Sequence, residues 1–221
     1  MMTSPVEALR QLLLVDERPN LPPRYNIAPS QDVPIVRLRK DRSGRELALV
    51  RWGLIPYWAK DPKIGAKLIN ARAESLATKP AFREAFARRR CLVPANGFYE
   101  WEKRGRARQP WLIRARDGGL LTFAGLWEHW RDPAGGSVTS CTIVTGEPNP
   151  LVARLHDRMP VILASEDHER WLRGEAGTAQ DLLRPFTDDG LEAFPVSPRL
   201  NSPVHDDPEL IRPLAVQDAL L

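Results

Sequence analysis

Proline is the residue that most restricts how this chain can fold. The 221 residues include 21 prolines, which are spread along the whole length. Proline cannot donate a backbone hydrogen bond, disrupts the interior of a helix and is confined to the edges and ends of strands. This frequency excludes long helices and favours many short strands joined by turns and extended loops.

The order of the expected elements favours an α+β fold. Segments 32–39 and 46–56 flank a turn-rich stretch and predict a hairpin, and a run of strands with glycine-containing turns is expected between residues 91 and 146. Short helices are expected at 4–14, 80–90, 149–156, 165–174 and 178–186. Because strands and helices do not alternate strictly, we expect a mainly antiparallel sheet or barrel.

The ends of the chain carry clear local signals. Ser4 can cap the first helix, Pro5 suits its first turn and Glu7 completes a capping box. Residues 194–213 carry a proline every few positions, so this tail is expected to be extended over the surface.

The composition predicts one domain over residues 1–221, although length alone also permits two small ones. We expect a cytoplasmic protein, with a monomer as the default because the sequence does not show the oligomeric state. A chain of this length with 43% hydrophobic residues can build one sizeable core. No apolar run approaches the roughly 20 residues that span a bilayer, and no export signal is evident at the start. A net charge of +4 permits a polyanionic partner without requiring one.

The two cysteines predict neither a metal site nor a disulfide. Cys91 and Cys141 lie far apart and lack the paired spacing of zinc ligands. Each falls in an expected strand, where a free cysteine is usually a small buried hydrophobe. We therefore expect no metal and no cofactor.

Three aromatic residues stand close together in the segment RWGLIPYWAKD. Trp52, Tyr57 and Trp58 are surrounded by prolines and basic residues. They can form a packed aromatic cluster, or they can form a platform on which unstacked bases lie. The sequence alone leaves both interpretations open.

Two further segments gather polar side chains. In LINARAES, Asn70, Arg72 and Glu74 alternate, which places them on one strand face; this face is either simply solvated or able to hold a phosphate. In RLHDRMPVIL, His156 and Asp157 precede an apolar run, so the imidazole can lie at the mouth of the core. A histidine in that position is a candidate for proton transfer, although a structural role is also open.

The segment RCLVPANGFYEW ends in a carboxylate between two aromatic residues. Glu100 stands between Tyr99 and Trp101 directly after a stretch that is typical of a buried strand. It can lie on the solvent face of an alternating strand. Alternatively, apolar neighbours can desolvate it and raise its pKa, which would make it an acid catalyst.

Taken together and in this order, the motifs resemble the SRAP family. These are the SOS response-associated peptidases, also described as abasic-site processing proteins of the DNA damage response. The resemblance rests on YNIAPSQ, WGLIP, NARAE, CLVPANGFYEW and HDRMPVIL, with VSPRLNSP in the tail, and so covers nearly the whole chain. It implies a single α+β domain built round a curved, barrel-like sheet with short flanking helices.

The resemblance also implies a reaction with single-stranded DNA. Family members capture the open-chain aldehyde of an abasic site through an N-terminal cysteine that is exposed when the initiator methionine is removed. The amine forms an imine and the thiol closes a thiazolidine, which leaves a stable DNA–protein cross-link. By similarity, the catalytic residues are Glu100, Asn70 and His156, and the DNA-binding residues are Arg72, Trp52 and Pro29.

This sequence departs from the family pattern at its start. The family opens Met-Cys-Gly-Arg, whereas this chain opens Met1-Met2-Thr3-Ser4. Cys91 and Cys141 carry no free α-amine and cannot close a thiazolidine. We expect a gene start assigned to a downstream methionine; the alternative is a natural form without cross-linking activity.

Two other functions stay open at this stage. One is a cysteine-peptidase-like hydrolase, which follows from the historical label of the family and a Cys–His–Asn set. The other is a binding module that holds single-stranded DNA in a basic groove without chemistry.

Overall fold

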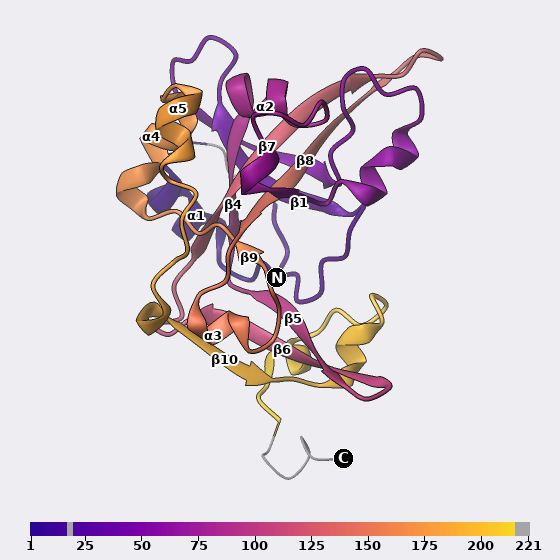
Figure 1. Cartoon of the computed structure of the whole chain (residues 1–221), viewed down its shortest axis with the longest axis vertical. Coiled ribbons are helices and arrows are strands. Elements are labelled where there is room, and N and C mark those ends of the chain that lie inside the picture. The colour runs from indigo at the N-terminus through magenta and orange to yellow at the C-terminus, as the bar shows by residue number, and fades with distance from the viewer. Residues whose placement is uncertain (17–19, 215–221) are drawn as a thin grey trace.

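The larger sheet closes into a barrel. The computed structural model describes residues 1–16 and 20–214. Strands pair in the order β2-β1-β4-β7-β8-β3, β9 pairs with β8, and β2 also pairs with β8, so that five strands form a ring (Figure 1). The strands of this sheet are β1 (Asp32–Leu38), β2 (Arg45–Trp52), β3 (Asn70–Arg72), β4 (Arg90–Ala95), β7 (Leu121–Arg131), β8 (Ser137–Gly146) and β9 (Met159–Pro160).

A second sheet lies against one end of the barrel. It contains β5 (Phe98–Arg104), β6 (Ala107–Ala115) and β10 (Leu191–Pro195), in the order β10-β6-β5 (Figure 1). The chain passes from β4 to β5 through Asn96 and Gly97. A Cβ at Gly97 would lie 2.6 Å from the carbonyl oxygen of Ile113, so only glycine allows this close approach to β6.

All helices are short, as the prolines predict. The α-helices are α1 (Val6–Leu13), α2 (Arg83–Arg88), α3 (Pro150–Ala153), α4 (His168–Arg173) and α5 (Ala176–Gln180). The 3₁₀ helices are η1 (Pro62–Lys67), η2 (Ala73–Ser75), η3 (Ser165–Asp167), η4 (Asp188–Gly190), η5 (Pro198–Asn201) and η6 (Pro208–Ile211). The predicted α+β class with a barrel-like core is confirmed.

Two local predictions at the chain ends are wrong. Helix α1 begins after Pro5 without a side-chain cap from the described residues. Ser4 is occupied elsewhere, because its hydroxyl accepts from Asn96 Nδ2 at 2.7 Å and its amide donates to Asn96 Oδ1 at 2.9 Å. Glu7 instead pairs with Arg10 one turn along. The tail is not wholly extended either, since the 3₁₀ helices η5 and η6 fall within it.

The barrel strands bury both faces. On β4, Leu92 packs with residues from α1, α2 and α4, whereas Cys91 and Val93 belong to the cluster that includes Phe98 and Ile113 of the second sheet. This alternation is the period of two expected for a strand. Cys91 and Cys141 are both free and buried, so the prediction of buried, unpaired thiols is confirmed.

The motif WGLIP contains a glycine whose conformation the fold requires. Gly53 has φ +125°, and a Cβ there would lie 2.7 Å from the carbonyl oxygen of Gly65. We expect Gly53→Ala to lower the free energy of unfolding by about 1–3 kcal/mol, because it adds both backbone strain and a clash. Urea denaturation measures this change.

The matched control is Gly177→Ala in α5. A Cβ added at Gly177 would meet no atom of another segment within 4 Å, so alanine should stabilise the helix by about 0.4–1 kcal/mol. Equal unfolding midpoints for Gly53→Ala and the unmodified protein would contradict the requirement for glycine at residue 53.

Candidate functional site

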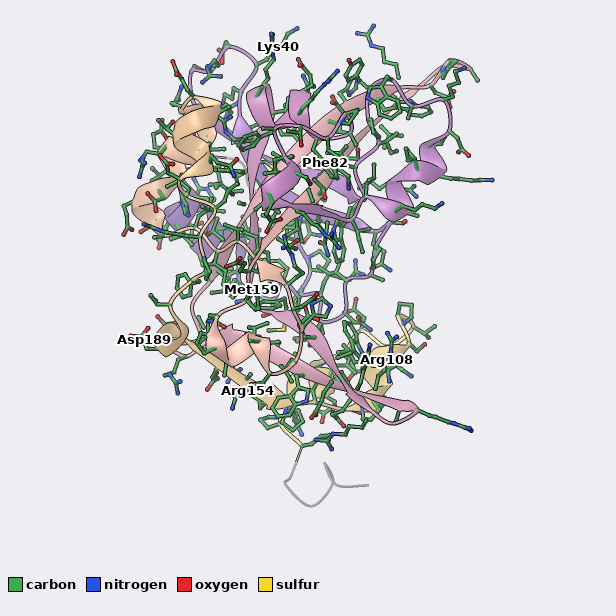
Figure 2. All side chains as sticks on the ribbon, viewed as in Figure 1. Lys40, Phe82, Arg108, Arg154, Met159 and Asp189 are labelled. Atoms are coloured by element: carbon green, nitrogen blue, oxygen red, sulfur yellow. The ribbon has the colours of Figure 1, made fainter. Side chains whose placement is uncertain are left out.

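One cavity is lined by all six catalytic and DNA-binding residues that the family resemblance implies. It has a volume of about 590 Å³ and is lined by residues from the barrel, from β5, from the N-terminus and from the tail. The cavity lies where the two sheets meet. Met159, one of its lining residues, is labelled in Figure 2. The predicted residues in its lining are Pro29, Trp52, Asn70, Arg72, Glu100 and His156.

Strand β8 brings two of the motifs to this cavity. β3 runs parallel to β8 and pairs Asn70 with Ile143 and Arg72 with Thr145. β9, which follows the His156 turn, is antiparallel to β8 and pairs Pro160 with Thr145. Segments that lie almost 90 residues apart in sequence are therefore adjacent at one end of β8.

The strand around Asn70 is shorter than predicted. Asn70 and Arg72 are exposed and Ala71 between them is fully buried, as alternation requires. Glu74 does not continue this strand face, because the backbone turns into η2 at Ala73. Its carboxylate instead accepts two hydrogen bonds from Arg158, at 2.8 and 2.9 Å.

The His156 turn is held by its own backbone and by Arg158. The amide of Arg158 donates to His156 Nδ1 at 3.0 Å. Because an N–H can only donate, Nδ1 is the acceptor in the neutral ring and Nε2 carries the proton. The guanidinium of Arg158 also donates to the carbonyl oxygen of Thr145 at 2.6 Å, which ties the turn to β8.

Glu100 lies on β5, opposite Trp111, and its side chain is half-buried. The pKa of Glu100 is raised to about 7, chiefly by burial and to a smaller extent by Asp157, while His156 and a hydrogen bond from the Trp101 amide act in the opposite direction. The carboxyl can therefore hold its proton near neutral pH, which a solvated glutamate cannot. The interpretation of Glu100 as an ordinary solvated strand residue does not fit this environment.

The aromatic residues of the WGLIP segment separate in the structure. Trp52 lines the cavity, and its indole N–H donates to the carbonyl oxygen of Ile69 at 2.9 Å. Tyr57 and Trp58 are 58% and 47% exposed, and neither belongs to the cavity lining. Exposed aromatic faces remain available for stacking, whereas one packed cluster of all three is not formed.

The two cysteines lie away from this chemistry. Neither thiol belongs to the cavity lining, and burial raises the pKa of both Cys91 and Cys141. Within residues 1–16 and 20–214, no three histidine, cysteine or acidic side chains are grouped so that they could hold a metal ion. Nor is any described helix long and apolar enough to cross a bilayer.

The N-terminus enters the cavity between the barrel and the second sheet, near the centre of Figure 1. The Met1 amine donates to the carbonyl oxygen of Gly97 at 3.0 Å. Burial lowers the pKa of this amine to about 5, and Asp206 offsets part of the effect. Burial at this position therefore favours the uncharged form of an amine.

Two residues of this region were not predicted as site residues. Arg158 belongs to the same motif as His156, so the spacing of that motif could have indicated it. Asp206 has no local signal, because its partners Arg24, Tyr25 and Asn26 lie about 180 residues away.

Comparison with known proteins shows the family of this chain. The sequence profile of the SOS response associated peptidase (SRAP) family matches residues 1–203. The chain belongs to the SRAP family. It is 46% identical to the abasic site processing protein YoqW of Bacillus subtilis (strain 168) over 193 residues, which cover 86% of this chain and 85% of that relative. It is also 34% identical to the abasic site processing protein HMCES of Gallus gallus, over 87% of this chain and 66% of the relative.

Solved structures of similar fold come from two other bacteria. A protein from Bordetella bronchiseptica aligns with a TM-score of 0.78 and 29% identity, covering 89% of this SRAP chain and 97% of its own. A protein from Bacteroides thetaiotaomicron aligns with a TM-score of 0.73 and 28% identity, covering 97% and 92%.

The environment of Glu100 gives a testable pH dependence. Its folded pKa of about 7 lies above its unfolded value. The stabilising contribution of the protonated acid is therefore fully present below about pH 4 and is lost as the pH rises through the folded pKa. Relative to Glu100→Gln, we expect the unmodified protein to lose up to about 3 kcal/mol of unfolding free energy between these limits.

Carboxyl carbon NMR of the folded protein measures the same property directly. Glu74 is the internal reference, because its hydrogen bonds from Arg158 lower its pKa. The two carboxyls should titrate on opposite sides of the ordinary glutamate value. A Glu100 signal that titrates together with Glu74 would contradict the assignment.

Proposed function

We propose that this SRAP protein processes abasic sites in single-stranded DNA and, in a form with an N-terminal cysteine, links itself covalently to them. The names of the relatives support the substrate class. The observation that carries the chemistry is Glu100, a carboxyl with a pKa of about 7 in the cavity that also contains Asn70 and His156. Condensation with an aldehyde needs such an acid.

The first proposed step forms an imine. The lone pair of the N-terminal amine attacks the aldehyde carbon of the opened sugar, and the carbonyl oxygen becomes a hydroxyl group. This hydroxyl carries one proton taken from the nitrogen. Protonated Glu100 gives its own proton to the hydroxyl, which leaves as water while the C=N bond forms, and the Glu100 carboxylate then takes the second proton from the nitrogen. The thiol of the same cysteine then adds to the imine carbon, and its proton passes to the nitrogen, which closes the thiazolidine.

The other cavity residues have separate roles in this proposal. Asn70 can hold the reacting oxygen through its side-chain amide. His156, with the proton on Nε2, can donate to the ring oxygen of the sugar and so assist ring opening. Arg72 contacts a phosphate, and Trp52 and Pro29 line the path of the DNA.

A thiol protease is less well supported. Both cysteines of the sequence are buried and lie outside the cavity lining, and burial raises the pKa of both thiols. A reactive cysteine needs the opposite environment. DNA binding without chemistry remains the second candidate, because the cavity and its basic residues do not require a nucleophile to hold a strand.

The first test concerns DNA binding. Arg72→Ala should weaken binding to single-stranded DNA and reduce the slope of log affinity against log salt by about 0.7, the value for one phosphate contact. Fluorescence anisotropy at several salt concentrations measures both quantities. The matched control is Arg106→Ala in the turn between β5 and β6, which removes the same charge away from the cavity lining and should leave the slope unchanged. Absence of single-strand binding at low salt would refute the proposal.

The second test concerns the covalent step. On a denaturing gel, the chain that opens Met1-Met2-Thr3 should give no heat-stable adduct with abasic single-stranded DNA. A version that opens Met-Cys-Gly-Arg should give one. Equal cross-linking by both proteins would exclude the N-terminal cysteine mechanism, and borohydride trapping of a lysine imine would become the next experiment.

In the cysteine-containing version, Glu100→Gln should slow cross-linking by about 10²- to 10⁴-fold while DNA affinity stays nearly constant. The amide keeps the size of the side chain but cannot give up the proton. His156→Ala is the comparison, since it should impair reversal of the adduct as well as its formation. A normal rate for Glu100→Gln between about pH 6 and 8 would show that this carboxyl is structural.

A further inference from the structure

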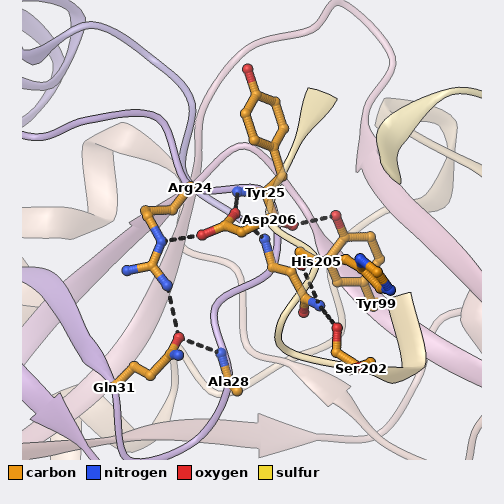
Figure 3. Close-up of polar contacts among 9 residues, drawn as sticks. Arg24, Tyr25, Ala28, Gln31, Tyr99, Ser202, His205 and Asp206 are labelled. Carbon is orange, nitrogen blue, oxygen red and sulfur yellow. Dashed lines mark hydrogen bonds and ion pairs between the residues drawn. The ribbon is translucent and has the colours of Figure 1, made fainter. Parts of the chain in front are cut away.

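A single carboxylate joins the C-terminal tail to the loop before β1 (Figure 3). Asp206 Oδ2 accepts from Arg24 Nε, and Oδ1 accepts from the amides of Tyr25 and Asn26. Burial alone would raise the pKa of Asp206, but these hydrogen bonds outweigh it and hold the pKa below its ordinary value. Asp206 is therefore a carboxylate at neutral pH.

The loop donates further hydrogen bonds to the tail through a side chain. Asn26 is buried, and its Nδ2 lies 3.2, 3.2 and 3.1 Å from the carbonyl oxygens of Leu200, Ser202 and His205. In all of these hydrogen bonds the loop donates and the tail accepts. We call these contacts of Asp206 and Asn26 the Asp206 network.

The loop in turn holds residues 1–3, which we call the N-terminal strand because Met2 forms an antiparallel bridge with Arg24. The backbone of Arg24 pairs with Met2 in both directions, each hydrogen bond being 2.8 Å long. On the other side of this strand, the backbone amide of Asn96 donates to the carbonyl oxygen of Met1 at 3.1 Å, and the carbonyl oxygen of Gly97 accepts from the Met1 amine. The strand therefore lies between the Arg24 loop and the turn that leads into β5 and Glu100.

The network also shapes the wall of the cavity from outside. Leu200, Asn201 and Pro203 of the tail line the cavity together with Met1 and Met2, whereas Asp206 is not among the lining residues. Asp206 therefore shapes the cavity wall through the segments that it joins, and it reaches the Met1 amine only through its charge.

We propose that Asp206 is a positioning residue that fixes, through Arg24, the N-terminal strand beside Glu100 and with it the place of the reacting amine. This inference rests on the proposed function for its consequence in catalysis. Its structural part, the control of residues 1–3 by Asp206, can be tested without any reaction.

The structural test uses the methionine methyl groups. The chain has three methionines, so a methyl-¹³C methionine NMR spectrum contains three signals. Asp206→Asn keeps one acceptor oxygen for the two amides but loses the charge that pairs with Arg24. We expect the signals of Met1 and Met2 to shift or broaden, while Met159, whose sulfur accepts from Asn149 at the other side of the cavity, stays unchanged.

Asp207→Asn is the matched control. Asp207 caps η6 and pairs with Arg199, so its loss affects the tail alone and should leave all three methyl signals in place. If Asp206→Asn also leaves Met1 and Met2 in place, the positioning role is overturned. Arg24→Gln is the second variant in case Asp206→Asn does not fold; it should reproduce the Met1 and Met2 shifts, and unchanged signals would again overturn the role.

The catalytic test uses the version that opens Met-Cys-Gly-Arg. We expect Asp206→Asn to lower the rate of adduct formation at saturating DNA by about 10²-fold, with DNA affinity within about twofold, because a small displacement of a reacting group has such an effect. An unchanged rate, or a loss of affinity that accounts for the whole change, would overturn the positioning role. If the unmodified version forms no adduct, the proposed function fails, while the methyl spectra still decide the role of Asp206.

Discussion

Hydrogen bonding along both edges of β8 is the interaction on which the rest of the molecule depends. β8 pairs with β7 and β9, and with β2 and β3, so it closes the barrel and also assembles the cavity. Its sequence, SVTSCTIVTG, is rich in β-branched residues and free of proline in a chain that has many. A slip of one residue between β3 and β8 would turn Asn70 and Arg72 away from the cavity.

Glu74 and Glu100 show how position decides the chemistry of one residue type. Glu74 accepts two hydrogen bonds from Arg158, and its pKa is lowered. Glu100 is desolvated without a cationic partner at hydrogen-bond distance among the described residues, and its pKa is raised. One carboxylate therefore stays ionised and structural, while the other can exchange a proton.

Much of the site could be predicted because its residues stand in compact motifs. The motifs around Asn70, Glu100 and His156 each fix a side chain on a short segment, and all three reach one cavity. The hairpin of β1 and β2 and the helix around Phe86 also follow from local pattern.

Contacts between distant segments account for what could not be predicted. Ser4 fails to cap α1 because Asn96 binds it, and no local pattern contains that partner. The barrel closes through a parallel pairing of β2 with β8, which alternation in either strand cannot reveal. Asp206 acts on a loop from the opposite end of the chain, so neither segment shows its role alone.

The contact of the tail with the first residues has a consequence for the order of synthesis. A ribosome releases residues 1–3 long before Asp206, because the carboxylate that holds their neighbouring loop stands 182 positions after Arg24. The barrel can form while the tail is still in the exit tunnel, but the cavity wall cannot be complete. A nascent chain therefore remains without its finished site until Asp206 has been released, and a chain that stops before this residue never acquires it.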